Sequence, residues 1–215
     1  MKPYTVQMSG NLVSFSILAI VLVLIPGLDF TLVIRYATTQ SKRSALAVAL
    51  GINTGLLVWG AFASFGISSI LQTSQVAFNV LRLMGICYMV AIGIGFIIQS
   101  FKIKEAFEVS TVEKGIFKTF YKGLLTNLLN PKAGVFYISV LPQFIPADQN
   151  HVLFGLLLTV MHTSISVLYF IILIFFIDRM RKYFQNPTFS KYLERISGVT
   201  VIGFGLKLLS SNSNT

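Results

Sequence analysis

Long apolar segments recur along this chain, and they constrain its fold more than any other feature. A helix needs roughly 20 apolar residues to cross a hydrocarbon core of about 30 Å. Six candidate spans lie at approximately 11–36, 44–71, 76–100, 119–145, 152–177 and 196–210. A soluble helical domain would need polar helix faces and longer hydrophilic connections, which this sequence lacks. Because 54% of the residues are hydrophobic and only 11% charged, against about 25% charged in soluble domains, we expect an all-α integral membrane protein.

The basic residues are distributed unevenly between the connections of these spans. Thirteen of the 17 lysines and arginines fall at the first, third and fifth connections. They are Arg35, Lys42, Arg43, Lys102, Lys104, Lys114, Lys118, Lys122, Arg179, Arg181, Lys182, Lys191 and Arg195. The positive-inside rule then predicts that the odd connections face the cytoplasm and that both termini lie outside it. The net charge of +10 thus indicates the orientation of the chain in the membrane, and anionic lipid head groups are secondary partners of these residues. We expect no nucleic-acid partner.

Two of the predicted spans are interrupted at corresponding places. Pro26 and Gly27 break the first span, and Asn130 and Pro131 break the fourth. Proline and glycine are common in membrane helices, which alone would explain one break. Two breaks at matching depth indicate instead that the two halves of the chain are related.

The resulting repeats cover about 10–100 and about 118–210, within a single transporter domain at 1–215. Each repeat holds three spans, so the second must enter the membrane from the opposite side. This arrangement is typical of inverted repeats, whose binding sites lie near the midplane where interrupted helices meet. The predicted fold therefore has six transmembrane helices in two inverted three-helix repeats, with the first and fourth helices interrupted near the midplane.

Each proline in these breaks removes a helical hydrogen bond. Because proline lacks an N–H, Pro26 leaves the carbonyl of Leu22 without its helical donor, and Pro131 does the same to Asn127. In lipid such a carbonyl needs another donor or a water-filled cavity. Polar backbone is therefore expected to line a site at both breaks, with Asn127 beside it.

The second break reads as a helix start followed by a positive charge. Asn130 suits the N-cap and Pro131 the first helical position, so a half-helix is expected to begin there with its free N–H groups near Lys132. The positive helix end and the ammonium group both favour an anion. The alternative is a kink whose lysine snorkels to the head groups. Snorkelling is difficult because Lys132 lies roughly 15 Å of helix beyond Lys122.

Asp29 supplies the opposite charge at the first break. A charge at the bilayer centre costs about 2.5 to 3.5 kcal/mol on insertion scales, so such residues usually serve a substrate, an ion or a proton. Asp29 and Lys132 together would match the ammonium and carboxylate groups of an amino acid. Asp29 could alternatively take up a proton, or the two residues could form a structural ion pair that a substrate displaces.

Polar residues elsewhere are weaker candidates for lining the cavity. Thr159, His162, Thr163 and Ser166 follow at i, i+3, i+4 and i+7, which places them on one stripe of the fifth span. Asn53 lies on the second span between two glycines that would allow close helix packing. The alternative for all five is a hydrogen bond to a neighbouring helix.

Three stretches of the chain carry a family resemblance, which covers nearly its whole length. They are PGLDFTLVIRYATTQSKRSALAVALGINTG from Pro26, LRLMGICYMVAIGIG from Leu81 and GLLTNLLNPKAGVFYISVLPQF from Gly123. The chain resembles the lysine exporter (LysE/RhtB) family of small bacterial amino-acid efflux proteins. The Asn-Pro-Lys motif of that family maps without change to 130–132. Its Pro-Gly-Pro-Asp motif maps to 26–29, with leucine in place of the second proline.

The resemblance implies a secondary transporter, not an enzyme, in the bacterial cytoplasmic membrane. It implies export of amino acids or their derivatives coupled to the proton gradient, without an organic cofactor. Relatives handle lysine, arginine, threonine, homoserine, cysteine-pathway metabolites and leucine, so the resemblance does not identify the substrate. The sequence leaves the oligomeric state open, with a homo-oligomer among the arrangements allowed.

Two other functions compete with export. A metal-ion efflux carrier needs clustered thiolate or imidazole ligands, whereas this chain has one cysteine and two histidines. An intramembrane aspartyl protease needs two buried aspartates, and only Asp29 qualifies. A serine protease could recruit His162 but lacks a recognisable nucleophile turn. We therefore expect neither a metal site nor an enzyme.

Overall fold

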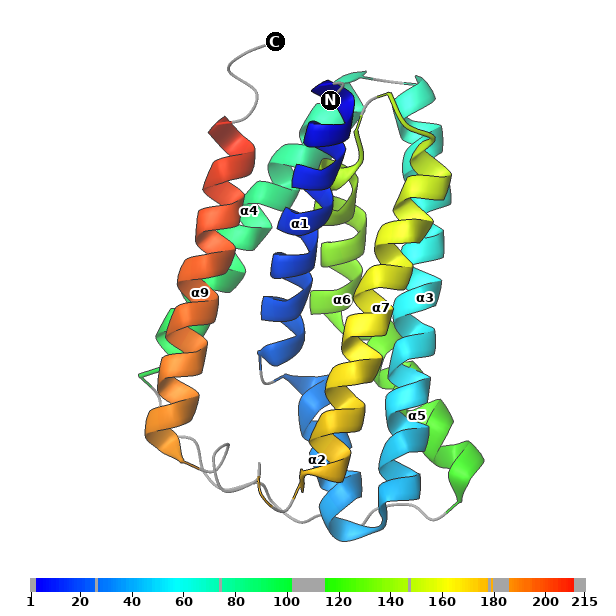
Figure 1. Ribbon diagram of the computed structural model, residues 1–215, viewed down its shortest axis with the longest axis vertical. Helices are drawn as coiled ribbons and strands as arrows, with labels where there is room; N and C mark the ends of the chain where they lie inside the picture. The colour runs from blue at the N-terminus through cyan, green and yellow to red at the C-terminus, as the bar shows by residue number, and fades with distance from the viewer. Residues whose placement is uncertain are drawn as a thin grey trace.

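The structure is a bundle of helices (Figure 1). The computed structural model describes residues 3–25, 27–73, 75–101, 115–146, 148–177, 179 and 186–210. Its helices are α1 (Pro3–Leu24), α2 (Leu28–Thr39), α3 (Lys42–Thr73), α4 (Gln75–Gln99), α5 (Ile116–Leu128), α6 (Pro131–Val135), the π-helical η1 (Phe136–Val140), the 3-10 helical η2 (Leu141–Phe144), α7 (His151–Phe175) and α9 (Pro187–Ser210). These ranges contain no strand, so the all-α prediction is confirmed for them.

The surface of the bundle fits a membrane environment. Within the ranges given above, α3 over Lys42–Gly66 and α7 are long and apolar enough to cross a membrane, and the bent pair α1 and α2 makes a third candidate span. Large apolar side chains stand exposed on several helices, among them Phe62 at 65%, Phe117 at 82% and Leu129 at 79%. Hydrocarbon suits such a surface better than water. The other helices coincide with predicted spans, and six crossings remain a prediction.

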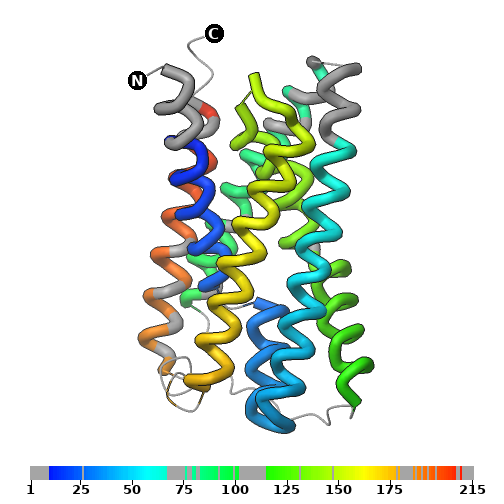
Figure 2. The backbone as a smooth tube through the Cα atoms, turned by 45° about the vertical axis from the view of Figure 1, so that its right-hand side comes forward, coloured from blue at the N-terminus to red at the C-terminus, as the bar shows by residue number. Residues whose placement is uncertain are grey.

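Helix α3 is central to the packing, since it contacts α5 and α7 along much of its length (Figure 2). Two glycines allow α5 to approach closely. A Cβ at Gly51 would overlap the backbone carbonyl of Phe120, and one at Gly55 would lie 2.6 Å from the side-chain oxygen of Asn127. The predicted role of these glycines in close packing is confirmed, and it brings the residues before the second break against α3.

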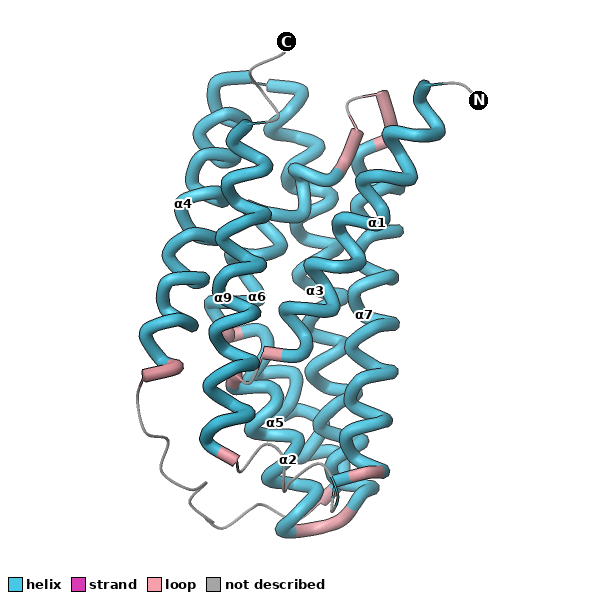
Figure 3. The backbone as a smooth tube through the Cα atoms, turned by 60° about the vertical axis from the view of Figure 1, so that its left-hand side comes forward, coloured by secondary structure: helices cyan, strands magenta, loops and turns pink. Residues whose placement is uncertain are grey.

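The first predicted span consists of two helices. Helix α1 ends at Leu24, α2 begins at Leu28, and the two are bent by 52° relative to each other (Figure 3). Gly27 precedes α2 in an extended conformation, and its carbonyl accepts the first helical bond, from the Thr31 N–H at 2.9 Å. Pro26, the other predicted break residue, lies outside the described residues.

The fourth predicted span is more irregular than a helix with one break. Helix α5 ends at Leu128, α6 begins at Pro131, and the chain then continues as one π-helical and one 3-10 segment. Pro142 lies in the first turn of η2 and has no N–H to bond back to the preceding turn. The change of helical register around it is consistent with that missing donor.

Two helices extend beyond the predicted membrane spans. Helix α9 begins at Pro187, before the predicted span at 196–210, and α1 begins at Pro3, before the predicted span at 11–36. Charged residues such as Lys191 and Arg195 lower the hydropathy of the first turns of α9 without preventing helix formation. Hydropathy locates the apolar part of a helix, whereas the helix itself extends beyond it.

Two buried apolar clusters fill the bundle, and the helix breaks lie between them. One cluster joins α1, η1, η2 and the first half of α7 through residues such as Phe15 and Tyr137. The other joins α2, the first half of α3 and the second half of α7 through residues such as Val33, Val48 and Leu173. Polar groups at the breaks are thereby kept between two dry cores.

Candidate functional site

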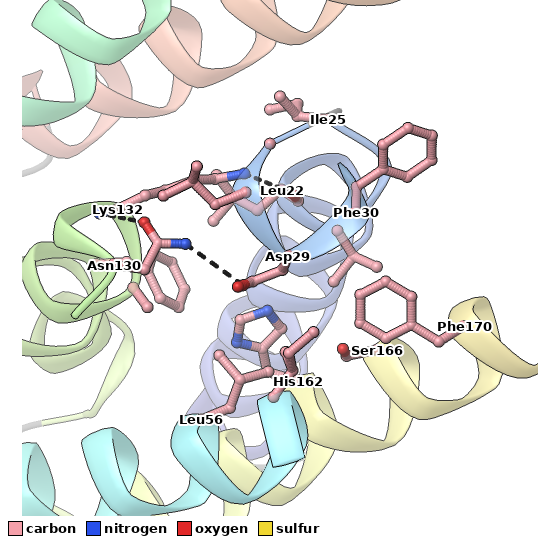
Figure 4. A pocket seen from close by; sticks show the side chains of 16 residues that line it. Leu22, Ile25, Asp29, Phe30, Leu56, Asn130, Lys132, His162, Ser166 and Phe170 are labelled. Carbon is pink, nitrogen blue, oxygen red and sulfur yellow. Dashed lines mark hydrogen bonds between the residues drawn. The ribbon is translucent and has the colours of Figure 1, made fainter. Parts of the chain in front are cut away.

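A cavity of about 70 Å³ lies between the two helix breaks. Both breaks contribute to it, and α3 and α7 form its other walls (Figure 4). Its lining includes Gly27, Asp29, Asn130, Lys132, His162 and Ser166. A space of this size holds several water molecules. The remaining lining is mostly apolar, so the cavity offers a few polar groups within a hydrophobic enclosure.

Lys132 reaches across the cavity to the first break. Its Nζ donates a hydrogen bond to the carbonyl oxygen of Leu22 at 3.0 Å. Leu22 is four residues before Pro26, so this carbonyl is the one that proline leaves without a helical donor. The same Nζ lies 5.7 Å from the centre of the Phe96 ring, within the range of a cation–π contact. The lysine is therefore directed toward the protein interior, which argues against the snorkelling alternative.

The first turn of α6 is already capped. The side-chain oxygen of Asn130 accepts from the Lys132 N–H at 3.0 Å, as an N-cap does. The N–H groups of Ala133 and Gly134 bond to the Asn130 carbonyl at 3.1 and 3.2 Å. The sequence predicts the cap, but the expected free N–H groups are paired in the structure. The ammonium group of Lys132, not the backbone, is thus the donor that this break presents.

Asp29 is held by the second break. Its Oδ2 accepts from Nδ2 of Asn127 at 2.9 Å and from Nδ2 of Asn130 at 3.4 Å. Its other oxygen, Oδ1, is buried and has no hydrogen-bond partner among the described residues. The carboxyl also lies in the first turn of α2, where the helix dipole favours a negative charge.

The two charged groups lie beside the same cavity without a direct bond. Lys132 donates to a backbone carbonyl and Asp29 accepts from two amides, and no ion pair joins them within the described part of the chain. The structure thus leaves one carboxylate oxygen free, beside an ammonium group that is bonded only to a backbone carbonyl.

Only part of the predicted polar stripe on α7 lines the cavity. His162 and Ser166 line the cavity, whereas the lining does not include Thr159 or Thr163. Thr159 bonds to the Gly155 carbonyl of its own helix at 2.8 Å. All four side chains are buried.

Asn53 also lies away from the cavity. It is buried, and its Nδ2 donates to the Ala49 carbonyl at 2.7 Å. Asn53 therefore does not line the cavity, and its amide bonds within its own helix instead of to a neighbouring one as the alternative predicted.

The chain matches one family of membrane transporters over most of its length. Residues 20–212 match the model of the LysE type translocator family. The chain belongs to this family. It is 30% identical to the uncharacterized membrane protein YrhP of Bacillus subtilis strain 168, over 92% of this chain and 97% of YrhP. It is 28% identical to a threonine efflux protein of Escherichia coli strain K12, over 89% of this chain and 94% of that protein. No solved structure matches the chain.

Some residues at the site of this LysE-type translocator were not expected from its sequence. Trp59 on α3 donates its Nε1–H to the Asn127 carbonyl at 3.4 Å. Tyr137 on η1 bonds through its hydroxyl to Nδ1 of His162 at 3.0 Å, and Phe96 on α4 faces Lys132. An aromatic residue in an apolar helix carries no local signal of such a role. Only the packing of distant segments brings these rings to the breaks.

A metal site is not evident in the translocator. The described residues contain no group of three or more histidine, cysteine, aspartate or glutamate side chains that could hold a metal ion. Cys87 is exposed on α4. The polar lining of the cavity offers one carboxylate and one imidazole, from Asp29 and His162, without the cluster of thiolate or imidazole ligands that soft metal ions prefer.

Proposed function

We propose that this translocator exports amino acids or amino-acid derivatives across the bacterial cytoplasmic membrane as a proton-coupled secondary transporter. The observation that carries the proposal is the presence of a carboxylate with one oxygen that has no partner among the described residues, and of an ammonium group, in the lining of the same cavity. These two poles complement the ammonium and carboxylate groups of a zwitterion. Membership of the LysE type translocator family and the resemblance to proteins named for threonine efflux support the same class of substrate.

Each pole has a defined role in this proposal. The free Oδ1 of Asp29 accepts from the substrate ammonium, while Asn127 and Asn130 hold the other oxygen in place. The Lys132 ammonium turns from the Leu22 carbonyl to the substrate carboxylate. The exchange replaces the neutral carbonyl acceptor by a negatively charged one, so it adds the attraction between opposite charges.

Proton coupling follows from competition at Asp29. A proton and a substrate ammonium both neutralise the carboxylate, so the two bind to it in alternation. A proton taken up by Asp29 on the outer side would displace the substrate ammonium, and its release on the inner side would restore the carboxylate for the next substrate molecule. Each cycle would then exchange one substrate for one proton.

The breaks support an arrangement of two inverted repeats in one domain. The carbonyl four residues before each proline accepts a hydrogen bond from the opposite half of the chain: Leu22 from Lys132, and Asn127 from Trp59 in addition to the Asn130 N–H of its own half. Helices α4 and α9 also meet through one glycine from each half of the chain. A Cβ added to Gly93 of α4 would lie 2.7 Å from the carbonyl oxygen of Gly198 of α9, and one added to Gly198 would lie 2.6 Å from the carbonyl oxygen of Gly93. Rocking of the two repeats about the cavity would open it to each side in turn.

The proposed topology places both termini outside the cytoplasm. In Figure 1, α1 begins and α9 ends at the same end of the bundle, as an even number of crossings requires. The basic connections would contact the anionic lipid head groups of the cytoplasmic leaflet. A homo-oligomer in the membrane is compatible with this arrangement.

The test is efflux of labelled amino acids from preloaded proteoliposomes, as a panel with and without a proton gradient. The Asp29→Asn variant retains the size of the side chain but loses its charge, so efflux should fall by about 10- to 100-fold, the value of one charge-assisted hydrogen bond. Asp148→Asn, a matched change at an exposed turn residue, should have no effect. Normal efflux by Asp29→Asn protein, or no efflux of any amino acid by the wild type, would refute the proposal.

A further inference from the structure

The wall of the cavity formed by α7 carries two polar side chains that the proposed charge poles do not use. His162 and Ser166 lie one helical turn apart and both line the cavity. Their exposed fractions are 6% and 2%, so more than nine-tenths of the surface of each residue is buried inside the protein. In Figure 4 both extend toward the space bordered by Asp29 and Leu56.

Neither residue satisfies its hydrogen-bonding capacity within the described part of the protein. Among the described residues no hydrogen bond from the Ser166 hydroxyl is found, and the hydrogen bond found for His162 joins its Nδ1 to the hydroxyl of Tyr137. Buried polar groups are nearly always hydrogen-bonded, because an unpaired one is costly. Two unpaired polar groups that face one cavity can therefore form hydrogen bonds with a molecule that enters it.

Tyr137 determines what His162 presents to the cavity. A phenol hydroxyl has one proton, and when it donates that proton to Nδ1 the neutral imidazole carries its own proton on Nε2. Nε2–H is then a donor toward the cavity. Phe136 and Phe15 pack edge-on against the ring, with centroids 5.2 and 6.5 Å away, and restrict its rotation. Tyr137 thus acts as a positioning residue for His162.

The chemistry of this wall matches a hydroxyl group. A hydroxyl can accept from Nε2–H of His162 and donate to the oxygen of Ser166 at the same time. An aliphatic side chain of equal size would leave both groups unpaired. A cationic side chain would find no second carboxylate among the lining residues, since Asp29 is already assigned to the substrate ammonium. The volume of about 70 Å³ favours a short side chain.

We propose that His162 and Ser166 form a side-chain subsite that selects small amino acids bearing a hydroxyl group over aliphatic amino acids of the same shape. This inference rests on the proposed function, because it assumes that the charge poles hold the amino and carboxyl groups of the substrate. Threonine and valine differ by a hydroxyl in place of a methyl group and are therefore the discriminating pair.

The experiment measures efflux of threonine and valine from the same preloaded proteoliposomes. Two hydrogen bonds to the hydroxyl predict that the wild type prefers threonine by about 5- to 100-fold. Ser166→Ala should lower this ratio by about 2- to 10-fold through slower threonine efflux, with valine efflux kept or raised. His162→Gln retains a hydrogen-bonding group and should keep more of the preference than His162→Leu. Tyr137→Phe should lower the ratio by less than His162→Leu does.

Ser64→Ala is the matched control for Ser166→Ala. Ser64 is equally buried, but its hydroxyl bonds to the Gly60 carbonyl at 2.7 Å and lies away from the cavity. Its replacement should leave the threonine-to-valine ratio unchanged. Equal efflux of both amino acids by the wild type, or a ratio unchanged in both Ser166→Ala and His162→Leu, would overturn the subsite while leaving amino-acid export intact. Absence of efflux of both substrates from the wild type would instead count against the proposed function itself.

Discussion

Replacing Lys132 with methionine tests the central feature of the site. Methionine keeps the length and apolar stem of the side chain but removes the ammonium group. The variant loses the 3.0 Å bond to the Leu22 carbonyl and the contact with the Phe96 ring at 5.7 Å. It also removes the only proposed donor for the substrate carboxylate.

The size of the effect follows from the bond that is lost. A hydrogen bond to a charged group contributes about 1.5–3 kcal/mol, which corresponds to about a 10- to 150-fold fall in efflux at low substrate concentration. The stability of the protein should change less. Loss of the bond leaves the Leu22 carbonyl unpaired at a cost of about 1–3 kcal/mol, but removal of a buried charge offsets part of that cost.

Efflux and thermal unfolding separate these two effects. Efflux is measured from preloaded proteoliposomes at matched protein density, and unfolding is measured in detergent. Lys122→Met is the matched control, because Lys122 is exposed on α5 and lies outside the cavity. It should leave both quantities unchanged.

A double variant tests whether Lys132 and Asp29 act together. If the two charges share one site, combining Lys132→Met with Asp29→Asn should cost less than the sum of the single changes, with a coupling of about 0.5–3 kcal/mol. Efflux by Lys132→Met at the wild-type rate would refute the reasoning. Strictly additive effects on efflux would show that the two residues serve separate steps.

Two further predictions concern the architecture around the site. Gly51→Ala should destabilise the protein by about 1–3 kcal/mol in thermal unfolding, because the new Cβ overlaps the backbone of Phe120. Gly66→Ala, on the same helix, places its Cβ in open space and should be neutral or slightly stabilising. Equal melting temperatures of the two variants would contradict the close packing. Asn130→Ala should cost about 0.5–2 kcal/mol through loss of an N-cap and should also lower efflux, because Asn130 bonds to Asp29. Asn150→Ala, which removes the N-cap of α7, should lower stability alone, and an Asn130→Ala protein with normal efflux would separate the cap from the site.

Features that depend on neighbouring residues could be predicted from the sequence. Proline lacks an N–H and so breaks a helix wherever it occurs in the chain, which is why the interruption of the fourth span was expected at Pro131. The Asn130 cap is also local, since its oxygen bonds two residues further on. The pairing of the Ala133 N–H, which bonds to the Asn130 carbonyl at 3.1 Å, was not predicted from the sequence.

Contacts between segments far apart in the chain could not be predicted in the same way. The α7 stripe illustrates the difference: its four polar residues were correctly grouped, but only His162 and Ser166 line the cavity. A stripe about 100° wide covers more than one neighbouring element, so its edges can face different surroundings. The packing of α1 and α3 against α7 decides which edge meets the cavity.

The sequence by itself determined the membrane class, the helical fold, the family and the two residues of opposite charge at corresponding breaks. Hydropathy, missing N–H groups and the spacing of motif residues are properties of short stretches, so they can be recognised directly in the sequence. The tertiary structure alone decided that Lys132 bonds to Leu22 and that Asn127 and Asn130 hold Asp29. Those bonds join residues about 100 positions apart, and they exist because helix packing brings both breaks to one cavity, where polar groups from the two halves of the chain come within hydrogen-bonding distance.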